Sequence, residues 1–318
     1  MDQALSELAA EARRALGSAG DHVPVGGGPP RYELFSAANS ICSQKVRVVL
    51  DHHELPYLSH DVKLFQGQTY VPEYVRLRMR GCERFGGALV SHHDGSTSAS
   101  ANGCDGAVVP TLIDWQIGEV VVDSKRICLH LDDQVDEADK LRPSRLAAAI
   151  DEDLDIVDNM PNYQMLMGRY LTASKSDATN DFAGGSFSQR KVAWCDRYLQ
   201  EHAGDASLVE AYTAKRAKEL SAANQLFSPA AMRGAYGRAE AGLQTLERKL
   251  EQRASVWLHA EAPTLADLIW GVELLRMKNI GVALWEAGRL PQVERFSAAS
   301  ERLHSIRAAI VEWPGAMF

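Results

Sequence analysis

The stretch YELFSAANSICSQKVRVVL, residues 32–50, decides the fold prediction because it joins a short apolar strand to an amphipathic helix. Residues 32–35 are the strand. Apolar side chains at a 3.6-residue spacing predict a helix over residues 42–53, with Lys45 and Arg47 outside the apolar stripe. The sequence therefore predicts a strand, a short loop and a helix with one buried and one polar face.

The motif Ser40-Ile41-Cys42-Ser43 places a thiol at the start of that helix. Unpaired N–H groups and the helix dipole favour an anion there. Cysteines in such positions can have pKa values as low as roughly 3.5–7.5. The motif therefore predicts a reactive thiolate at Cys42, with small core packing as the alternative explanation of a lone cysteine.

Composition and charge indicate a globular protein rather than a nucleic-acid-binding or membrane protein. The chain has 318 residues, 46% of them apolar and 24% charged, which is long enough for two domains. Its net charge is −8 and no Lys/Arg-rich run occurs, so nucleic acid is a poor partner. No apolar run approaches the ~18 residues of a membrane span. Because the N-terminus also lacks the apolar centre of a secretory signal, we expect a cytoplasmic protein.

The cysteines and histidines do not form a metal-binding or disulfide pattern. The five cysteines are odd in number and widely scattered, without a Cys-x-x-Cys pair. His52-His53 and His92-His93 are not accompanied by carboxylate or cysteine ligands at metal-site spacing. We therefore expect free thiols in a reducing compartment and no metal.

The first half of the chain reads as an extension followed by an α/β domain. Residues 1–30 carry a surface helix and a Gly/Pro-rich breaker. The domain of residues 31–135 contains the unit above, an extended segment at 57–63, a β-hairpin over 108–122 and a helix at 124–131. Residues 81–106, rich in Gly, Ser and His, are predicted to be an inserted surface loop, either disordered or placed near the active site.

Pro110 lies at the start of the first hairpin strand, which is unusual because proline cannot donate to a sheet ladder. An X-Pro bond at this position could be cis. From residue 142 onward the strand patterns cease, and helical periodicity predicts an all-helical domain over residues 142–318. Its predicted helices cover residues 143–170, 189–226, 235–253, 264–277 and 299–312.

Four features in this order resemble the glutathione transferase family. They are the Ser/Cys motif after the first strand, Val109-Pro110, Asp123-Ser124 and the capping box Thr264-Leu265-Ala266-Asp267. The resemblance covers residues 31–318 apart from the insertion. It implies an α+β, thioredoxin-like N-terminal domain (βαβαββα) followed by an all-α helical domain.

The resemblance also implies glutathione as cosubstrate and a role for each motif. The backbone of Val109, before a cis Pro110, would pair with the cysteinyl part of glutathione. Ser124, at a helix N-terminus with its neighbouring N–H groups, would bind the γ-glutamyl carboxylate, and Asp123 beside it would also contact glutathione. Taken by itself, the Asp123-Ser124 pair could be only a helix cap. Ser40 would donate a hydrogen bond to the glutathione sulfur. No metal or flavin is implied.

Within the family, residues 39–47 (NSICSQKVR) are similar to members that remove halide reductively from halogenated hydroquinones. This similarity implies conjugation of glutathione to the ring, followed by attack of Cys42 on the glutathione sulfur to give a mixed disulfide. The partner would be a small aromatic substrate. Whether the chain forms a homodimer is left open by the resemblance. Tyr163, Arg169 and Arg276 are candidates to face the phenol, although ordinary contacts explain each more readily.

Two other functions remain open on the sequence alone. One is a different glutathione-dependent reaction, such as β-aryl ether cleavage or maleylacetoacetate-type isomerisation. The other is a non-catalytic module that binds ligands or partners. An isomerase regenerates glutathione, an etherase leaves a thioether and a reductase makes oxidised glutathione, so the products separate these functions. A binding module would need neither Ser40 nor Cys42.

Overall fold

The computed structural model describes residues 3–23, 25, 28–93, 103–172 and 184–317, with the side chains of 169–172 left out. Within these ranges the strands form one sheet in the order β1-β3-β2-β4-β5. Neighbours β2 and β3 are parallel, and the other pairs are antiparallel. The strands are β1 Asp21–Val23, β2 Tyr32–Ser36, β3 Tyr57–Asp61, β4 Thr111–Asp114 and β5 Glu119–Val122.

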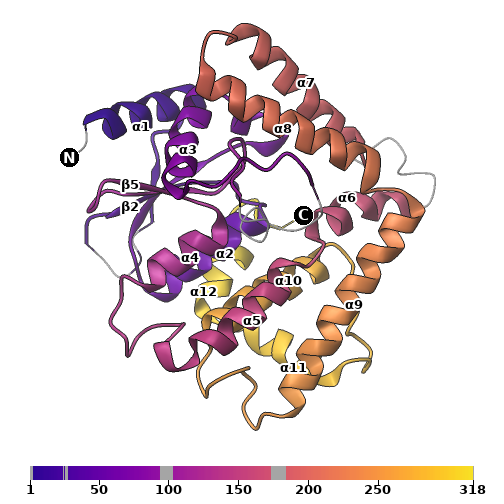
Figure 1. Cartoon of the computed structure of the whole chain (residues 1–318). Helices are drawn as coiled ribbons and strands as arrows, with labels where there is room; N and C mark the ends of the chain where they lie inside the picture. The colour runs from indigo at the N-terminus through magenta and orange to yellow at the C-terminus, as the bar shows by residue number, and fades with distance from the viewer. Residues whose placement is uncertain (1–2, 24, 26–27, 94–102, 173–183, 318) are drawn as a thin grey trace.

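The two faces of the sheet belong to different hydrophobic cores because strand side chains alternate. On one face Leu34 and Leu112 pack with α2 (Ile41–His52) and α4 (Ser124–Asp132). On the other face Phe35 and Ile113 pack with α1 (Gln3–Leu16) and α3 (Pro72–Phe85). The sheet and these helices are the predicted thioredoxin-like domain (Figure 1).

The N-terminal extension is part of this domain rather than a surface addition. Helix α1 buries Leu5, Ala9 and Leu16 against α3, and β1 pairs with β3 along the edge of the sheet. The predicted helix is present, but the sequence did not reveal strand β1 or the packing of α1 against α3. Strand β1 has only three residues and no buried side chain, so its sequence carries no strand signal.

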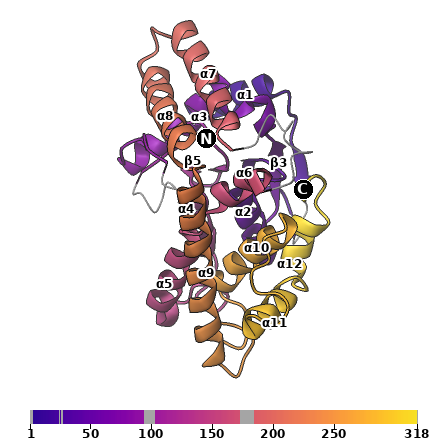
Figure 2. The same ribbon diagram turned by 90° about the vertical axis from the view of Figure 1, so that its right-hand side faces the viewer.

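The remaining helices form the predicted all-helical part. They are α5 Ala147–Asp158, α6 Asn162–Thr172, α7 Ser186–Glu201, α8 Ala206–Gln225, α9 Pro229–Glu251, α10 Leu265–Asn279, α11 Pro291–Ser300 and the short α12 His304–Ile306. The α7–α8 hairpin packs beside α1 and α3 at one end of the molecule, far from α11 (Figure 2). None of the helices in the described part of the chain is long and apolar enough to cross a membrane.

Three predicted helix spans differ from the structure. The span 143–170 divides at Pro161, and the span 189–226 divides where Asp205 caps α8. The span 299–312 is helical only in part: α11 ends at Ser300, Leu303 is extended, and helical structure resumes in α12 and the π-helical turn Arg307–Val311. An apolar period of 3.6 does not reveal such interruptions, because the residues on both sides of the break remain buried.

Helix α10 joins the two parts and begins at the predicted capping box. The Asp267 carboxylate accepts hydrogen bonds from the Thr264 N–H at 2.7 Å and from the Leu258 N–H at 2.8 Å. The helix is buried along nearly its whole length and packs against both α2 and α5. As a result, residues 43–50 of α2 are all buried, including Lys45 and Arg47, which the sequence placed on a polar face.

The predicted insertion 81–106 begins inside a helix. Helix α3 continues to Phe85 and ends at Gly86, whose φ of +61° suits glycine. Residues 94–102 lie outside the described residues. Beyond them Cys104 bridges to Leu89, and Cys104 and Asp105 are both buried. The two ends of the insertion are therefore packed into the protein.

Candidate active site

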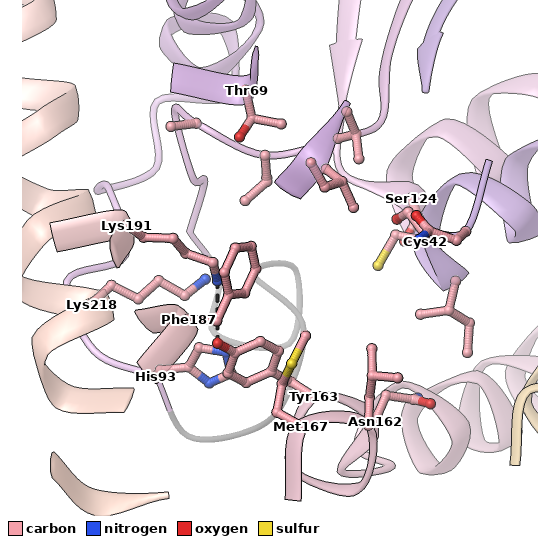
Figure 3. A pocket seen from close by; sticks show the side chains of 18 of the residues that line it. Cys42, Thr69, His93, Ser124, Asn162, Tyr163, Met167, Phe187, Lys191 and Lys218 are labelled. Carbon is pink, nitrogen blue, oxygen red and sulfur yellow. Dashed lines mark hydrogen bonds between the residues drawn. The ribbon is translucent and has the colours of Figure 1, made fainter. Parts of the chain in front are cut away.

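A cavity of about 270 Å³ lies between the two parts of the molecule. One wall is formed by the start of α2, the loop before β4 and the start of α4. The opposite wall is formed by α6, α7 and α8, and Figure 3 shows Cys42 and Ser124 on one side and Tyr163, Lys191 and Lys218 on the other. Five of the six predicted site residues line the cavity, namely Ser40, Cys42, Val109, Asp123 and Ser124; Pro110 follows directly behind Val109.

Ser40 is the N-cap of α2 and is only half-buried at the cavity wall. Its side-chain oxygen accepts the Ser43 N–H at 3.4 Å. A hydroxyl that accepts a hydrogen bond still has its own hydrogen to donate. Ser40 can therefore stabilise the helix and at the same time donate to an anionic group in the cavity.

Cys42 is the second residue of α2, and its thiol opens onto the same cavity. Burial raises the pKa of Cys42 above its ordinary value. The Lys45 ammonium lowers the pKa, Asp123 raises it, and a hydrogen bond with Ser124 lowers it. The predicted low-pKa thiolate was therefore wrong for the protein without ligand, because desolvation outweighs the favourable charge of Lys45.

A buried group of charged side chains lies behind Cys42. The Lys45 ammonium donates to Asp158 at 2.7 Å, and the side chains are almost fully buried. Nearby, Asn162 donates to Glu273 at 2.5 Å. Burial raises the pKa of Glu273 to about 7, although Lys45 lowers it. Sequence reasoning missed this group because its members come from α2, α5, α6 and α10.

The Val109–Pro110 peptide bond is cis, as predicted. The loop that holds it is fixed from α3: the Tyr74 hydroxyl donates to the Val108 carbonyl at 2.7 Å, and the Arg78 guanidinium donates to the carbonyl of Pro110. Arg78 is fully buried. Neither α3 residue was singled out from the sequence, where only their helical spacing of four hinted that they share a face.

Asp123 and Ser124 begin α4 on the cavity wall. The Asp123 carboxylate accepts the Lys125 N–H at 3.1 Å, and burial raises the pKa of this carboxyl group. Its φ of +76° is unusual for a residue with a side chain, and such backbone conformations cost of order 1–3 kcal/mol. The fold thus holds the start of α4 in a strained conformation that faces the cavity.

Two buried arginines hold the loop that carries Ser40. Arg276 donates to the Asn39 carbonyl at 2.7 Å and to the Gln44 side chain at 2.9 Å. Arg47 donates to the carbonyls of Ala37 and Ala38 at 3.2 and 2.8 Å. Arg276 lines the cavity, as the phenol-facing prediction requires, and its guanidinium also donates to this loop and to α2.

Of the other two candidates for the phenol, Tyr163 lines the cavity and Arg169 has a side chain outside the described residues. The Tyr163 hydroxyl is hydrogen-bonded to Ser188 at 2.7 Å and receives a hydrogen bond from Lys191 at 3.3 Å. Lys191, Lys215 and Lys218 bring a group of lysines to this end of the cavity. The sequence did not reveal this group, because its carboxylate partners lie far apart in the chain.

Comparison with known proteins agrees with the fold and the motifs. The model of the glutathione S-transferase N-terminal domain matches residues 39–134. Two relatives from strains of Sphingobium indicum, both described as 2,5-dichlorohydroquinone reductive dechlorinase, are 33% identical over 290 residues, which is 90% of this chain and 84% of each relative. The chain therefore belongs to the glutathione S-transferase family.

Solved structures share the fold at low sequence identity. The β-etherase of Sphingobium sp. strain SYK-6 has a TM-score of 0.56 at 14% identity, covering 88% of this chain and 98% of its own. A glutathione transferase of Phanerochaete chrysosporium with oxidised glutathione has a TM-score of 0.52 at 14% identity, covering 89% and 94%. These likenesses establish the two-part architecture as the glutathione transferase fold.

The reactivity of the five cysteines, all in the described part of the chain, follows from their burial. Cys42 alone is half-exposed, and the other four are buried. Cys82 and Cys104 lie at the ends of the predicted insertion, yet both are buried. The Cys82 thiol and the Arg126 guanidinium hold the pKa of Cys104 below its usual range, but only 1% of Cys104 is exposed, so access limits its reaction.

We predict that iodoacetamide labels Cys42 first in the native protein, and that its rate keeps rising beyond pH ~8.5, the ordinary thiol pKa. The reason is that burial raises its pKa, so the thiolate fraction is small at neutral pH. Peptide-resolved mass spectrometry across pH 6–10 measures this, with the denatured protein as the reference. A Cys42 rate that is already constant below pH ~7 would instead show that the helix N-terminus outweighs burial.

Proposed function

We propose that this protein catalyses glutathione-dependent reductive dehalogenation of a halogenated hydroquinone. The observation that carries the proposal is that Ser40 and Cys42, two residues apart at the start of α2, open onto one cavity. A plain glutathione transferase reaction needs only the hydroxyl, whereas a reductive reaction also needs a protein thiol. The 33% identity to two 2,5-dichlorohydroquinone reductive dechlorinases supports the same substrate class.

The cavity wall next to α2 offers a site for glutathione. The backbone of Val109 can pair with the cysteinyl part of the tripeptide, as in strand addition. The start of α4 offers N–H groups and the Ser124 hydroxyl to the γ-glutamyl carboxylate, and Asp123 can pair with its ammonium group. In this arrangement the sulfur would lie near Ser40 and Cys42.

The first step forms an aryl thioether. The Ser40 hydroxyl donates a hydrogen bond to the glutathione sulfur and so favours its thiolate. The thiolate attacks the halogen-bearing carbon of a keto tautomer of the hydroquinone, a C–S bond forms, and halide leaves. The raised pKa of Cys42 suits this order of events, because it favours the protonated form of the protein thiol while glutathione reacts as its thiolate.

The second step removes the sulfur from the ring. The Cys42 sulfur attacks the glutathione sulfur, the C–S bond breaks, and a proton, equivalent to that of the Cys42 thiol, is added to the ring carbon. The product is the dehalogenated hydroquinone together with a Cys42–glutathione disulfide. A second glutathione then reduces this disulfide by thiol–disulfide exchange and leaves as oxidised glutathione. Overall, two glutathione molecules supply the two electrons.

With 2,5-dichlorohydroquinone and glutathione, we predict that the wild-type protein releases chloride and oxidised glutathione in equal amounts. Cys42→Ser should accumulate the aryl–glutathione conjugate, because only the second step needs the protein thiol. Mass spectrometry of the products distinguishes these outcomes, and Cys195→Ala serves as a control at a buried thiol. Normal yields of dechlorinated product from Cys42→Ser would contradict the two-step scheme. Thioether without oxidised glutathione from the wild type would favour a different glutathione reaction.

Ser40→Ala should slow conjugate formation by about one to two orders of magnitude. A hydrogen bond to a charged group contributes roughly 1.5–3 kcal/mol, which is expressed in the rate if it acts in the transition state. Glutathione affinity should change far less. The measurement is single-turnover conjugate formation.

The matched control is Ser228→Ala, because Ser228 is also a helix N-cap, accepting the Ala231 N–H at 3.2 Å, and does not line the cavity. Both variants lose a cap, so both should lose roughly 0.5–2 kcal/mol of stability. Ser40→Thr retains the hydroxyl and should recover most of the rate. Equal rates for the wild type and Ser40→Ala would remove Ser40 from the mechanism.

A further inference from the structure

The end of the cavity opposite Cys42 carries an excess of buried positive charge. Lys215 lies between two carboxylates, Asp105 at 2.8 Å and Glu219 at 2.9 Å. Lys218 also contacts Asp105, at 3.1 Å, and Lys191 contacts Glu219, at 3.1 Å. Among the described residues, three ammonium groups thus share two carboxylates. We call these five residues the lysine cluster.

The side chains of the lysine cluster are buried in the protein and do not form a solvated surface patch. Lys215 and Lys218 are buried, Lys191 is 14% exposed, and the carboxylates are almost fully buried. The three lysines and Glu219 line the cavity. Burying an unbalanced charge is costly unless a counter-charge is bound. The cluster is therefore suited to an anionic group that enters the cavity.

A buried hydroxyl lies next to the lysine cluster with no acceptor. Tyr70 lines the cavity, is 2% exposed, and has its ring 5.8 Å from the Lys215 nitrogen. Its hydroxyl makes no hydrogen bond within the described part of the chain. Buried polar groups without partners are rare in folded proteins. An acceptor atom on a ligand would satisfy this donor.

Aromatic side chains surround the entrance to the lysine cluster. His93 stacks on Tyr163 with ring centroids 4.9 Å apart, and the Lys191 nitrogen lies 4.6 Å from the centre of the Tyr163 ring and 4.7 Å from that of Phe187 (Figure 3). Burial and the nearby lysines lower the pKa of His93 to about 3, so this ring is neutral. A flat, negatively charged aromatic molecule fits these surroundings better than a flexible aliphatic acid.

We propose that the lysine cluster and the Tyr70 hydroxyl bind the oxygen of a halogenated phenol as its phenolate. Lys191 and Lys218 supply the charge, and Tyr70 donates a hydrogen bond. The inference rests on the proposed function for the identity of the substrate. It adds that the substrate first binds as an anion, which takes a proton on a ring carbon to become the keto tautomer that the thiolate attacks. The phenolate oxygen lies at the α7–α8 end of the cavity, with the opposite side of the ring toward Ser40 and Cys42.

Binding without turnover tests this proposal. The probes are 2,5-dichlorophenol, its methyl ether 2,5-dichloroanisole, and S-methylglutathione, titrated calorimetrically at a pH where the phenol is ionised. Lys218→Met leaves two lysines for two carboxylates and so removes the excess charge. Loss of a charged hydrogen bond should weaken phenol binding by about ten- to a hundredfold. Binding of the ether and of S-methylglutathione should change less than twofold.

Two further variants complete the test. Lys249→Met removes an ion pair with Asp153, at 2.8 Å, away from the cavity, and should leave all three affinities unchanged. Tyr70→Phe removes only a hydroxyl that has no partner within the described residues, so the fold should tolerate it, and phenol binding should weaken several-fold. A Lys218→Met variant that fails to fold therefore does not prevent the test.

Each other outcome overturns the proposal in a distinct way. Equal losses for phenol and ether would show that the lysine cluster acts through packing alone. A loss confined to S-methylglutathione would assign it to a glutathione carboxylate. No change with either variant would remove it from ligand binding. Since none of these readouts involves halide release, normal dechlorination with unaltered phenol binding would overturn this inference while leaving the proposed function intact.

Discussion

The active-site geometry depends on the hydrogen bonds that two buried arginines donate to the loop before α2. Arg47 holds the carbonyls of Ala37 and Ala38 and also contacts the Ala309 carbonyl at 3.1 Å, while Arg276 reaches the Asn39 carbonyl from α10. The loop that presents Ser40 is therefore fixed from the helical part as well as from its own domain. The position of Ser40 therefore depends on the packing of the two parts against each other.

The same packing explains the electrostatics of the thiol. Helix α10 packs against α2, and Lys45 is buried with Asp158 of α5, while Cys42 opens onto the cavity. Burial then raises the pKa of Cys42, and Lys45 only partly compensates. A raised pKa favours the protonated thiol in the protein without ligand, which suits a residue that acts second. The positively charged end of the cavity is the opposite one, where Lys191, Lys215 and Lys218 line the wall.

The sequence predicted those features that depend on local chemistry. The β2–α2 unit, the cis bond before Pro110, the cap at Asp123 and the capping box of α10 all follow from short motifs, and each is present. Five predicted site residues also line one cavity. The features that it missed depend on contacts between distant segments, such as the burial of Arg47 against the Ala309 carbonyl and the Trp313 ring, and the assembly of the lysine cluster from Asp105, α7 and α8. Periodicity describes one face of one helix, and it cannot show that a second helix covers the other.

The central claim is that Cys42 takes the sulfur from the glutathione conjugate. Rapid quenching in acid during turnover with 2,5-dichlorohydroquinone, with glutathione limiting, followed by intact-mass and peptide analysis, tests this most directly. We expect a disulfide-linked glutathione on Cys42 alone, which appears together with the dechlorinated product and disappears when more glutathione is added. Dechlorinated product formed at full rate with no glutathione on Cys42 at any time would contradict the account.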